Sequence, residues 1–434
     1  MQTEPARKTA KDASDAALQG DVDSKRRLAW GYGTFRRIWL ATVLFSLGNW
    51  TERIVVGFFV LDLSGSVFLT AATFAARQAP GVIAAPIAGA IVDRWPRSRV
   101  LAATAIYKTS ILAALAFVAS ADNPALWPVF LLTALSGIGQ SFEIPATQGL
   151  VTDSVPRHVR MNAVAVQSVG ARGIGAIGGL MSGLVIDELG VASAVSIGAA
   201  AFVSGALMTL LIRSTPTPPH RGQTTQRGLK VFRSAYVDLV SLLSIPAIRV
   251  LLIGAVLVEM FGFAFGSLLP SVSVNVLGTA GSGLGALNMM ASFGGLAGVI
   301  ALSVLGDYPR KERLLVGITL MYGSFLVLFA SSGLFSLSMV LIAGVGMSAG
   351  AFDAMQWTLL QSKAPEHMRG RVVGGWVFAI GFGWLGHLGL GGLGEIIGVQ
   401  WALGGAGSLV FIVGLVLWRY SHRFATESEP VRTY

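Results

Sequence analysis

The chain has 434 residues, of which 53% are hydrophobic and only 12% are charged. A soluble globular protein carries about twice that share of charged residues, so the composition excludes an ordinary soluble fold. The 54 glycines suit close helix packing in a bilayer. The chain has no cysteine, which excludes a disulfide framework, a thiolate metal site and a cysteine nucleophile.

The net charge of +10 could indicate nucleic-acid binding, but the basic residues are distributed differently. Four of the 32 lysines and arginines lie inside apolar runs: Arg53, Arg77, Lys108 and Arg172. The others lie in the two ends of the chain and in or beside every second loop. A nucleic-acid partner would need one clustered basic face, so we expect none. Alternation along the chain is instead typical of a membrane protein with its basic loops in the cytoplasm.

Taken in order, the chain begins with a polar stretch, 1–34, that is mixed in charge and lacks an apolar core of signal-peptide length. It predicts a disordered cytoplasmic tail. Apolar runs long enough to cross a bilayer follow. There are twelve of them: 37–62, 67–91, 99–120, 125–148, 160–186, 190–212, 248–275, 282–305, 314–332, 335–358, 372–396 and 399–419. The prediction is an all-α membrane protein with twelve transmembrane helices.

The loops between these runs predict how the protein is oriented. Six of them contain no lysine or arginine: 63–66, 121–124, 187–189, 276–281, 333–334 and 397–398. The loops that alternate with them are basic. Because basic loops stay in the cytoplasm, we expect both termini to be cytoplasmic in a multi-pass protein of the cell membrane (inner or plasma).

The longest loop, 213–247, divides the chain into two bundles of six helices, 35–212 and 248–421, followed by a cytoplasmic tail, 422–434. The loop starts with a proline-rich linker. Apolar residues then recur at helical spacing from about 229 to 244, with basic and polar residues between them. This pattern predicts an amphipathic helix on the inner membrane surface.

The two halves resemble each other in sequence. The loop Gly89–Arg99 contains Asp93, and a weaker copy with Asp307 occurs 214 residues later. Phe142-Glu143 likewise has its counterpart in Phe352-Asp353. Internal repeats of this kind are typical of transporters, whose halves are related by pseudo-symmetry.

These motifs identify a family resemblance that covers roughly 35–420. The loop resembles the pattern Gly-x-x-x-Asp-Arg-x-Gly-Arg of the major facilitator superfamily, with matches at Gly89, Asp93, Arg94 and Arg97; Pro96 replaces the glycine. The chain looks most like the branch of enterobactin-exporter-like and multidrug efflux permeases. The supporting phrases are Ser46–Trp50, Leu61–Ser66, Phe142–Thr147 and Gly370–Val372. The glycine-rich stretch Gly170–Gly183 lies where exporters of the family carry a Gly-Pro-x-x-Gly-Gly phrase, but the proline is absent.

In this family, spans 1, 4, 7 and 10 line a central cavity. In this sequence each of those spans carries an acid: Glu52, Glu143, Glu259 and Asp353. A charge inside a membrane costs several kcal/mol against lipid, so each should face a cavity or a partner. Glu52 and Arg53 are adjacent and point about 100° apart on a helix. One of them is therefore free to face the cavity while the other pairs with a neighbouring helix.

A carboxylic acid in an apolar cavity keeps its proton more readily than in water, and a nearby arginine opposes this. We expect Glu52 and Glu259 to carry protons, with Arg53, Arg77 or Arg172 tuning them. The alternative is a set of static ion pairs that fix helix register. Glu143 and Asp353 lie nearer the cytoplasmic ends, where Arg94 or Arg97 could hold them. The weaker candidates for lining a substrate cavity are Asn49, Trp50, Gln140, Gln356 and Trp357.

Lys108 is a charge at mid-depth in span 3, and we expect it to pair inward with a partner that the sequence does not identify. The charged loops are expected to form a conformational latch on the cytoplasmic side. Its candidate residues are Gly89, Asp93, Arg94, Arg97, Asp307 and Arg310.

The resemblance implies a secondary active transporter, not an enzyme, that works by alternating access as a monomer. The predicted function is export of hydrophobic or amphipathic small molecules, such as drugs or siderophores, in exchange for protons. No cofactor or metal is expected, because the proton gradient supplies the energy. The alternatives are a permease or lipid-translocating member with other coupling and, from another class, a membrane-embedded enzyme or a transporter-like sensor.

Overall fold

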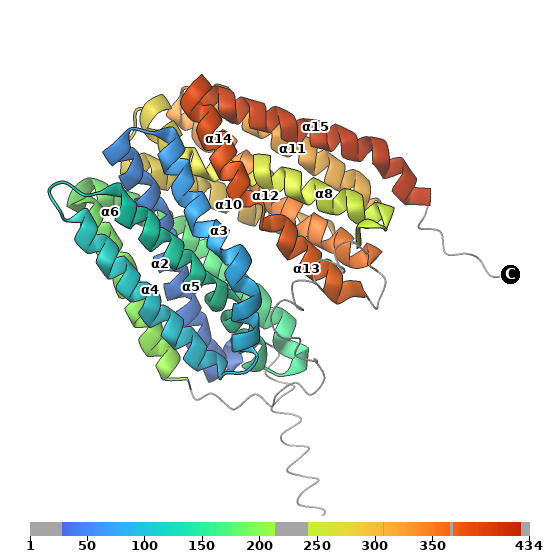
Figure 1. Ribbon diagram of the computed structural model, residues 1–434. Helices are drawn as coiled ribbons and strands as arrows, with labels where there is room; N and C mark the ends of the chain where they lie inside the picture. Colours follow the sequence, from blue (N-terminus) through green and yellow to red (C-terminus); the bar gives the residue numbers. More distant parts are fainter. Residues whose placement is uncertain (1–27, 213–241, 307, 365–367, 427–434) are drawn as a thin grey trace, which may run out of the picture.

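The structure of the protein is a computed structural model (Figure 1). It describes residues 28–212, 242–306, 308–364 and 368–426. Within these residues every regular element is helical, which confirms the predicted all-α class. The predicted tail 1–34 lies outside them except for its last seven residues, and the predicted amphipathic helix lies almost wholly outside them.

The elements of the first half are η1 (Ala29–Gly31), α2 (Gly33–Ser64), α3 (Val67–Val92), α4 (Arg97–Ala119), α5 (Leu126–Asp153), η2 (Arg157–Val159) and α6 (Arg160–Leu210). Those of the second half are α8 (Pro246–Phe261), η3 (Phe263–Ser267), α9 (Leu269–Ser271), η4 (Val272–Val276), α10 (Gly281–Leu305), α11 (Lys311–Ser331), α12 (Phe335–Lys363), α13 (Arg369–Ile380), α14 (Gly383–Ile397) and α15 (Val399–Thr426). The predicted spans agree with these bounds to within a few residues at most ends.

Among the described residues, 11 helical segments are long and apolar enough to cross a membrane. One of them contains α6, whose 51 residues would extend about 75 Å as a straight helix. A hydrocarbon core is only about 30 Å thick. The helix is interrupted at Gly190, where φ is 81° and ψ is 171°. Because α6 holds two of the predicted spans, the structure is compatible with twelve.

Two predicted spans are less regular than expected. Span 7 does not continue as one helix to residue 275: α8 ends at Phe261, and a 3₁₀ segment, one short turn and a π-helical segment follow. Pro270 lacks an N–H group and cannot continue the backbone ladder. Span 11 is divided between α13 and α14 at Gly381 and Phe382, where glycine favours a break.

Glycines allow matching helix pairs in the two halves to approach closely. A Cβ on Gly137 of α5 would lie 1.8 Å from the carbonyl oxygen of Arg77 on α3. In the second half, a Cβ on Gly346 of α12 would lie 2.0 Å from the carbonyl oxygen of Ala291 on α10. Both contacts are too short for any side chain, so backbone packs directly on backbone, as in other membrane bundles.

We call the membrane side on which α2 begins the tail side and the opposite side the far side. The two halves lie next to each other in Figure 1 and make their close contacts toward the far side. There Gly183 of α6 faces Gly281 of α10, and Gly391 of α14 faces Ala71 of α3. Toward the tail side of α3, Ile83 and Ile87 are 67% and 52% exposed. The structure is therefore closed on the far side.

Candidate functional site

Six polar side chains from four helices of the first half meet in its interior, and we call them the first polar cluster. They are Asn49 and Glu52 of α2, Arg77 of α3, Lys108 of α4, and Gln140 and Glu143 of α5. Two carboxylates face two cations, so the charges balance within the cluster. This balance is what permits four charged groups to be buried together.

Lys108 lies at the centre of this cluster. The sequence alone did not identify a partner for its charge. Its side chain is fully buried. The amine donates to Asn49 Oδ1 and to Glu143 Oε2, the latter at 3.4 Å, and lies 3.9 Å from Glu52 Oε2. It also lies 4.7 Å from the centre of the Phe202 ring, a cation–π contact. The expected inward pairing is therefore present, and two acids provide it.

Asn49 links the charged members of the cluster. Its amide donates to Glu143 Oε1 at 2.8 Å, and its side-chain oxygen accepts from Arg77 Nη2 at 3.1 Å. The guanidinium of Arg77 also donates to Gln140 Oε1 at 3.3 Å. Asn49 and Gln140 thus hold the charged groups in place in this structure.

Glu52 is held more loosely than Glu143. Its nearest cations, Arg77 Nη1 and Lys108 Nζ, lie 3.8 and 3.9 Å from Oε2, beyond hydrogen-bonding distance. Oε2 is buried and accepts no hydrogen bond from the described residues. A cavity of about 10 Å³ adjoins it, which is room for about one water molecule. The residues lining that cavity are Glu52, Arg53, Val56, Thr73, Phe74, Arg77 and Thr133.

A second set of charged and polar groups lies at the boundary between the halves, and we call it the boundary group. It comprises Arg53, Gln78 and Arg172 of the first half and Glu259 and Asp353 of the second. Glu259 interacts electrostatically with Asp353 and with Arg53, and Asp353 interacts with Arg172. The side chains of Gln78 and Glu259 both lie within 3.0 Å of the position that a Cβ on Gly383 would occupy.

Arg53 points away from Glu52, as the 100° between neighbouring residues predicts. Its guanidinium carbon lies 5.3 Å from the Trp50 ring centre and 5.5 Å from that of Phe74. One of its nitrogens lies 2.8 Å from where a Cβ on Gly266 of η3 would be. Arg53 therefore reaches from α2 to the irregular part of span 7 in the second half.

The other predicted lining residues have different surroundings. Gln356 is buried and donates to the carbonyl oxygen of Leu251 at 2.8 Å, which ties α12 to α8. Trp357 packs edge-on against Trp376 of α13, with ring centres 4.9 Å apart. Trp50 lies beside the boundary group through its contact with Arg53. Gln78 was not predicted from the sequence. It directly follows Arg77, a charged residue inside an apolar run, and this adjacency was the available signal.

The predicted latch residues lie at the tail-side ends of α3, α4 and α11. Arg97 binds Asp153 at 2.5 Å, linking the start of α4 to the end of α5. Asp93 follows the last residue of α3 and is exposed, as are Gly306 and Arg310 in the second half. Glu143 pairs with Lys108 and not with Arg94 or Arg97 in this structure. Gly89 is partly exposed and Arg94 is exposed. Asp307 lies outside the described residues.

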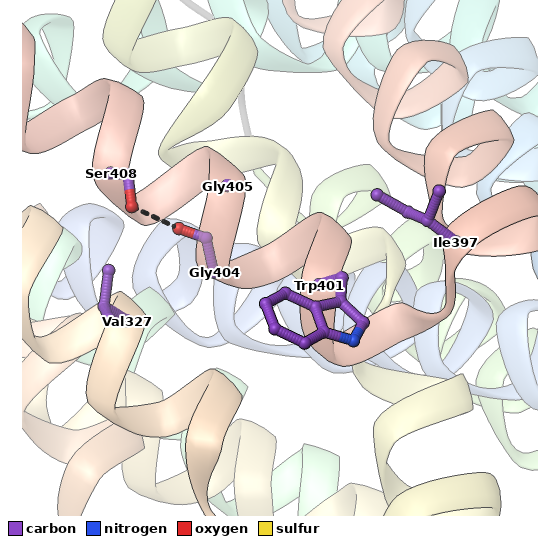
Figure 2. A pocket seen from close by; sticks show the side chains of 6 residues that line it. All are labelled: Val327, Ile397, Trp401, Gly404, Gly405 and Ser408. Carbon is purple, nitrogen blue, oxygen red and sulfur yellow. Dashed lines mark hydrogen bonds between the residues drawn. The ribbon is translucent and has the colours of Figure 1, made fainter.

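A cavity of about 650 Å³ lies between α11 and α15, away from these charges (Figure 2). Its lining residues are Val327, Ile397, Trp401, Gly404, Gly405 and Ser408. Trp401 is 77% exposed, and Ser408 donates to the carbonyl oxygen of Gly404 at 2.8 Å. The lining carries no charge and none of the candidate residues. This groove is an outer surface of the bundle.

Within the described ranges, no group of three or more histidine, aspartate or glutamate side chains is placed to hold a metal ion. The site consists of balanced charges inside one half and opposed charges across the boundary of two similar halves. A helical membrane protein with this architecture has the form of a secondary transporter.

Comparison with known proteins identifies the family. The family model of the Major Facilitator Superfamily matches residues 38–387. Enterobactin exporters EntS of Citrobacter koseri and Escherichia coli are 27% identical over 335 residues, which is 76% of this chain and 78% of theirs. Among solved structures, the nucleoside transporter NupG has a TM-score of 0.72 at 13% identity, covering 89% of this chain and 99% of its own.

A bacterial homologue of the human lysosomal transporter Spinster has a TM-score of 0.70 at 16% identity, covering 92% of this chain and 99% of its own. The protein belongs to the major facilitator superfamily. It is a multi-pass membrane transporter and not an enzyme, as the sequence predicts.

Proposed function

We propose that the protein is a proton-coupled exporter of hydrophobic or amphipathic small molecules, of the siderophore or drug type. It would lie in the inner or plasma membrane as a monomer, with the tail side in the cytoplasm, and exchange protons for substrate without a cofactor. The similarity to the enterobactin exporters supports export over other modes. Lipids, substrate and protons are its expected partners, and nucleic acid is not.

The observation that supports the proton coupling is that Arg53 of the first half lies against the second half, where it interacts with Glu259. Arg53 adjoins the same small cavity as Glu52 and interacts with Glu259 across the boundary. A proton on Glu259 removes one negative charge and so weakens the attraction that holds Arg53 toward the second half. Protonation then favours separation of the halves at this point, which is how a local charge change drives a global transition.

Glu52 is the second candidate carrier. Its Oε2 is free of hydrogen bonds from the described residues and adjoins space for about one water molecule. That arrangement supports proton exchange at Glu52, whereas the tighter contacts of Glu143 with Asn49 and Lys108 support a static role.

The test is transport in liposomes with an imposed pH gradient, using dyes and siderophores as substrates. We expect Glu52→Gln and Glu259→Gln to lose most of the acceleration by the gradient, while exchange of substrate without a gradient continues. Asp122→Asn, in the exposed loop after α4, is the control and should behave as wild type. If both glutamine variants respond to the gradient like wild type, the carrier assignment is wrong. If the wild-type protein moves these substrates with no response to pH, the alternative of a permease or lipid translocator with other coupling replaces it.

A further inference from the structure

The far-side turns of the two halves contain a second repeat, distinct from the charged loops. Asp187 precedes Gly190 by three residues, and Glu395 precedes Gly398 by three, 208 residues further along the chain. Both glycines have positive φ, 81° and 94°, with extended ψ of 171° and 148°. Valine follows each of them and begins the next span. The two turns thus share sequence pattern and backbone.

Each acid in these turns crosses to the opposite half. Asp187 accepts hydrogen bonds from the backbone N–H groups of Gly281 and Ser282, each at 2.8 Å. Glu395 accepts from the backbone N–H of Phe68 at 3.0 Å and from the hydroxyl of Ser66 at 3.2 Å. These N–H groups belong to the first turns of α10 and α3. Backbone N–H groups in the first turn of a helix have no hydrogen-bond partner within that helix.

The helix starts that receive the acids are equivalent as well. Gly65, with φ of 62°, precedes Ser66 and α3, and Gly278, with φ of 61°, precedes Thr279 and α10. The end of span 5 therefore binds the start of span 8, and the end of span 11 binds the start of span 2. The pseudo-symmetry of the halves therefore repeats the same contact: once from the first half to the second, and once from the second half to the first.

We propose that Asp187 and Glu395 are a pair of carboxylate clasps that hold the far side of the transporter closed. They are positioning residues for alternating access and are not part of the proton path. The inference rests on the family's identity as a transporter and not on the proposed proton coupling or substrate.

Three features of the contacts support a conformational role over a role in folding. Both clasps join the two halves and not helices within one half. Their partners are helix N-termini, whose partial positive charge attracts a carboxylate. Both acids are exposed, so that water can replace the lost hydrogen bonds once the far side opens. Breaking a clasp therefore weakens the closed state and leaves each half intact.

Glycine at position 281 makes room for one clasp. A Cβ there would lie 2.8 Å from Asp187 Oδ1 and 2.9 Å from the carbonyl oxygen of Gly183. Gly281→Ala would therefore push the two helices apart while every charge is kept. It provides a route to loosening the clasp that does not touch the acid.

The experiment measures the distance between the halves on the far side by pulsed electron spin resonance. The chain has no cysteine, so Asp122→Cys and Gly333→Cys, in exposed far-side loops of the two halves, can be labelled directly. We expect Asp187→Asn and Glu395→Gln each to raise the ratio of far-side-open to far-side-closed protein by about tenfold, since each removes charge-assisted hydrogen bonds. The double variant should shift it further.

Glu188→Gln removes a neighbouring exposed acid that makes no hydrogen bond or ion pair across the halves among the described residues, so it is the matched control and should match wild type. Gly281→Ala should open the far side as the acid variants do, and Asp187→Glu should restore part of the closed population. Distance distributions of both acid variants and of Gly281→Ala that overlay wild type would overturn the proposal, even where melting temperature falls. Because the measurement needs neither substrate nor a pH gradient, its result is independent of the proposed function.

Discussion

The two halves share a fold but differ in the charges that they bury. The first half contains all four of the predicted intramembrane cations, and its cluster around Lys108 balances two acids with two bases. The second half contributes two acids, Glu259 and Asp353, whose cationic neighbours Arg53 and Arg172 come from the first half. The first polar cluster is therefore balanced within the first half, whereas Arg53 and Arg172 of the first half and the two acids of the second depend on how the halves dock. A motion between the halves changes the surroundings of Glu259 and Asp353 more than those of Glu143.

The largest effect that would break this comparison is expected at Lys108. Lys108→Met leaves Glu143 and Glu52 buried with one cation fewer, and removing one partner of a buried pair costs about 3–5 kcal/mol. Thermal unfolding in detergent should show the loss. Adding Glu143→Gln restores the charge balance and should recover a large part of it. A Lys108→Met protein that melts like wild type would show that the cluster does not need its own cation.

Helix packing should be equally demanding in the two halves, in contrast to their charges. Gly137→Ala in the first half and Gly346→Ala in the second each force a methyl group into backbone, at a cost of about 1–3 kcal/mol or more. Gly389→Ala is the control, since no atom lies within 4 Å of its Cβ position. Unfolding midpoints of the three variants measure this, and unequal losses at the first two would contradict the expected symmetry.

A smaller difference separates two acids of the opposite halves. Glu143→Gln loses charged hydrogen bonds with Asn49 and Lys108 and should cost about 1–3 kcal/mol. Glu259 makes no ion pair within 4.0 Å among the described residues but is hydrogen-bonded to Gln78, so Glu259→Gln should cost about 1 kcal/mol. Parallel denaturation curves test the order. The reverse order would mean that the boundary group contributes more to folding than the first polar cluster.

The smallest effects are expected at the tail side, where the halves carry ion pairs of reversed sign. Arg97 at the start of α4 binds Asp153, while Glu312 at the start of α11 binds Lys363 at 2.8 Å. Asp153→Asn and Glu312→Gln should each change stability by about 1 kcal/mol or less, because partly exposed pairs contribute little. Added salt should reduce the difference from wild type further. A loss of several kcal/mol in either variant would contradict this ranking.

Hydropathy was sufficient to predict the helices, because the bilayer requires long apolar runs and the runs end at charged loops. It could not predict the breaks in spans 7 and 11, since Gly262 and Phe382 stand in stretches as apolar as any other. The adjacency of Glu52 and Arg53 indicated directions about 100° apart, and in the structure Glu52 lies in the first polar cluster while Arg53 lies against Gly266 of the second half. The partners of Lys108 could not be predicted, because they depend on how α2, α4 and α5 pack together. Asp187 and Glu395 were not predicted, because the orientation of the spans was inferred from basic residues and these two acids lie at loops that contain none.

The irregular span 7 has a mechanical consequence. Its counterpart in the first half, α2, is a continuous helix of 32 residues, whereas span 7 changes after Phe261 to 3₁₀, α and then π geometry. The first behaves as a stiff rod and the second as a jointed one, so bending between the halves should concentrate in residues 262–276. Amide hydrogen exchange there should be faster than at equal depth in α2, which would make this segment the compliant part of the transporter.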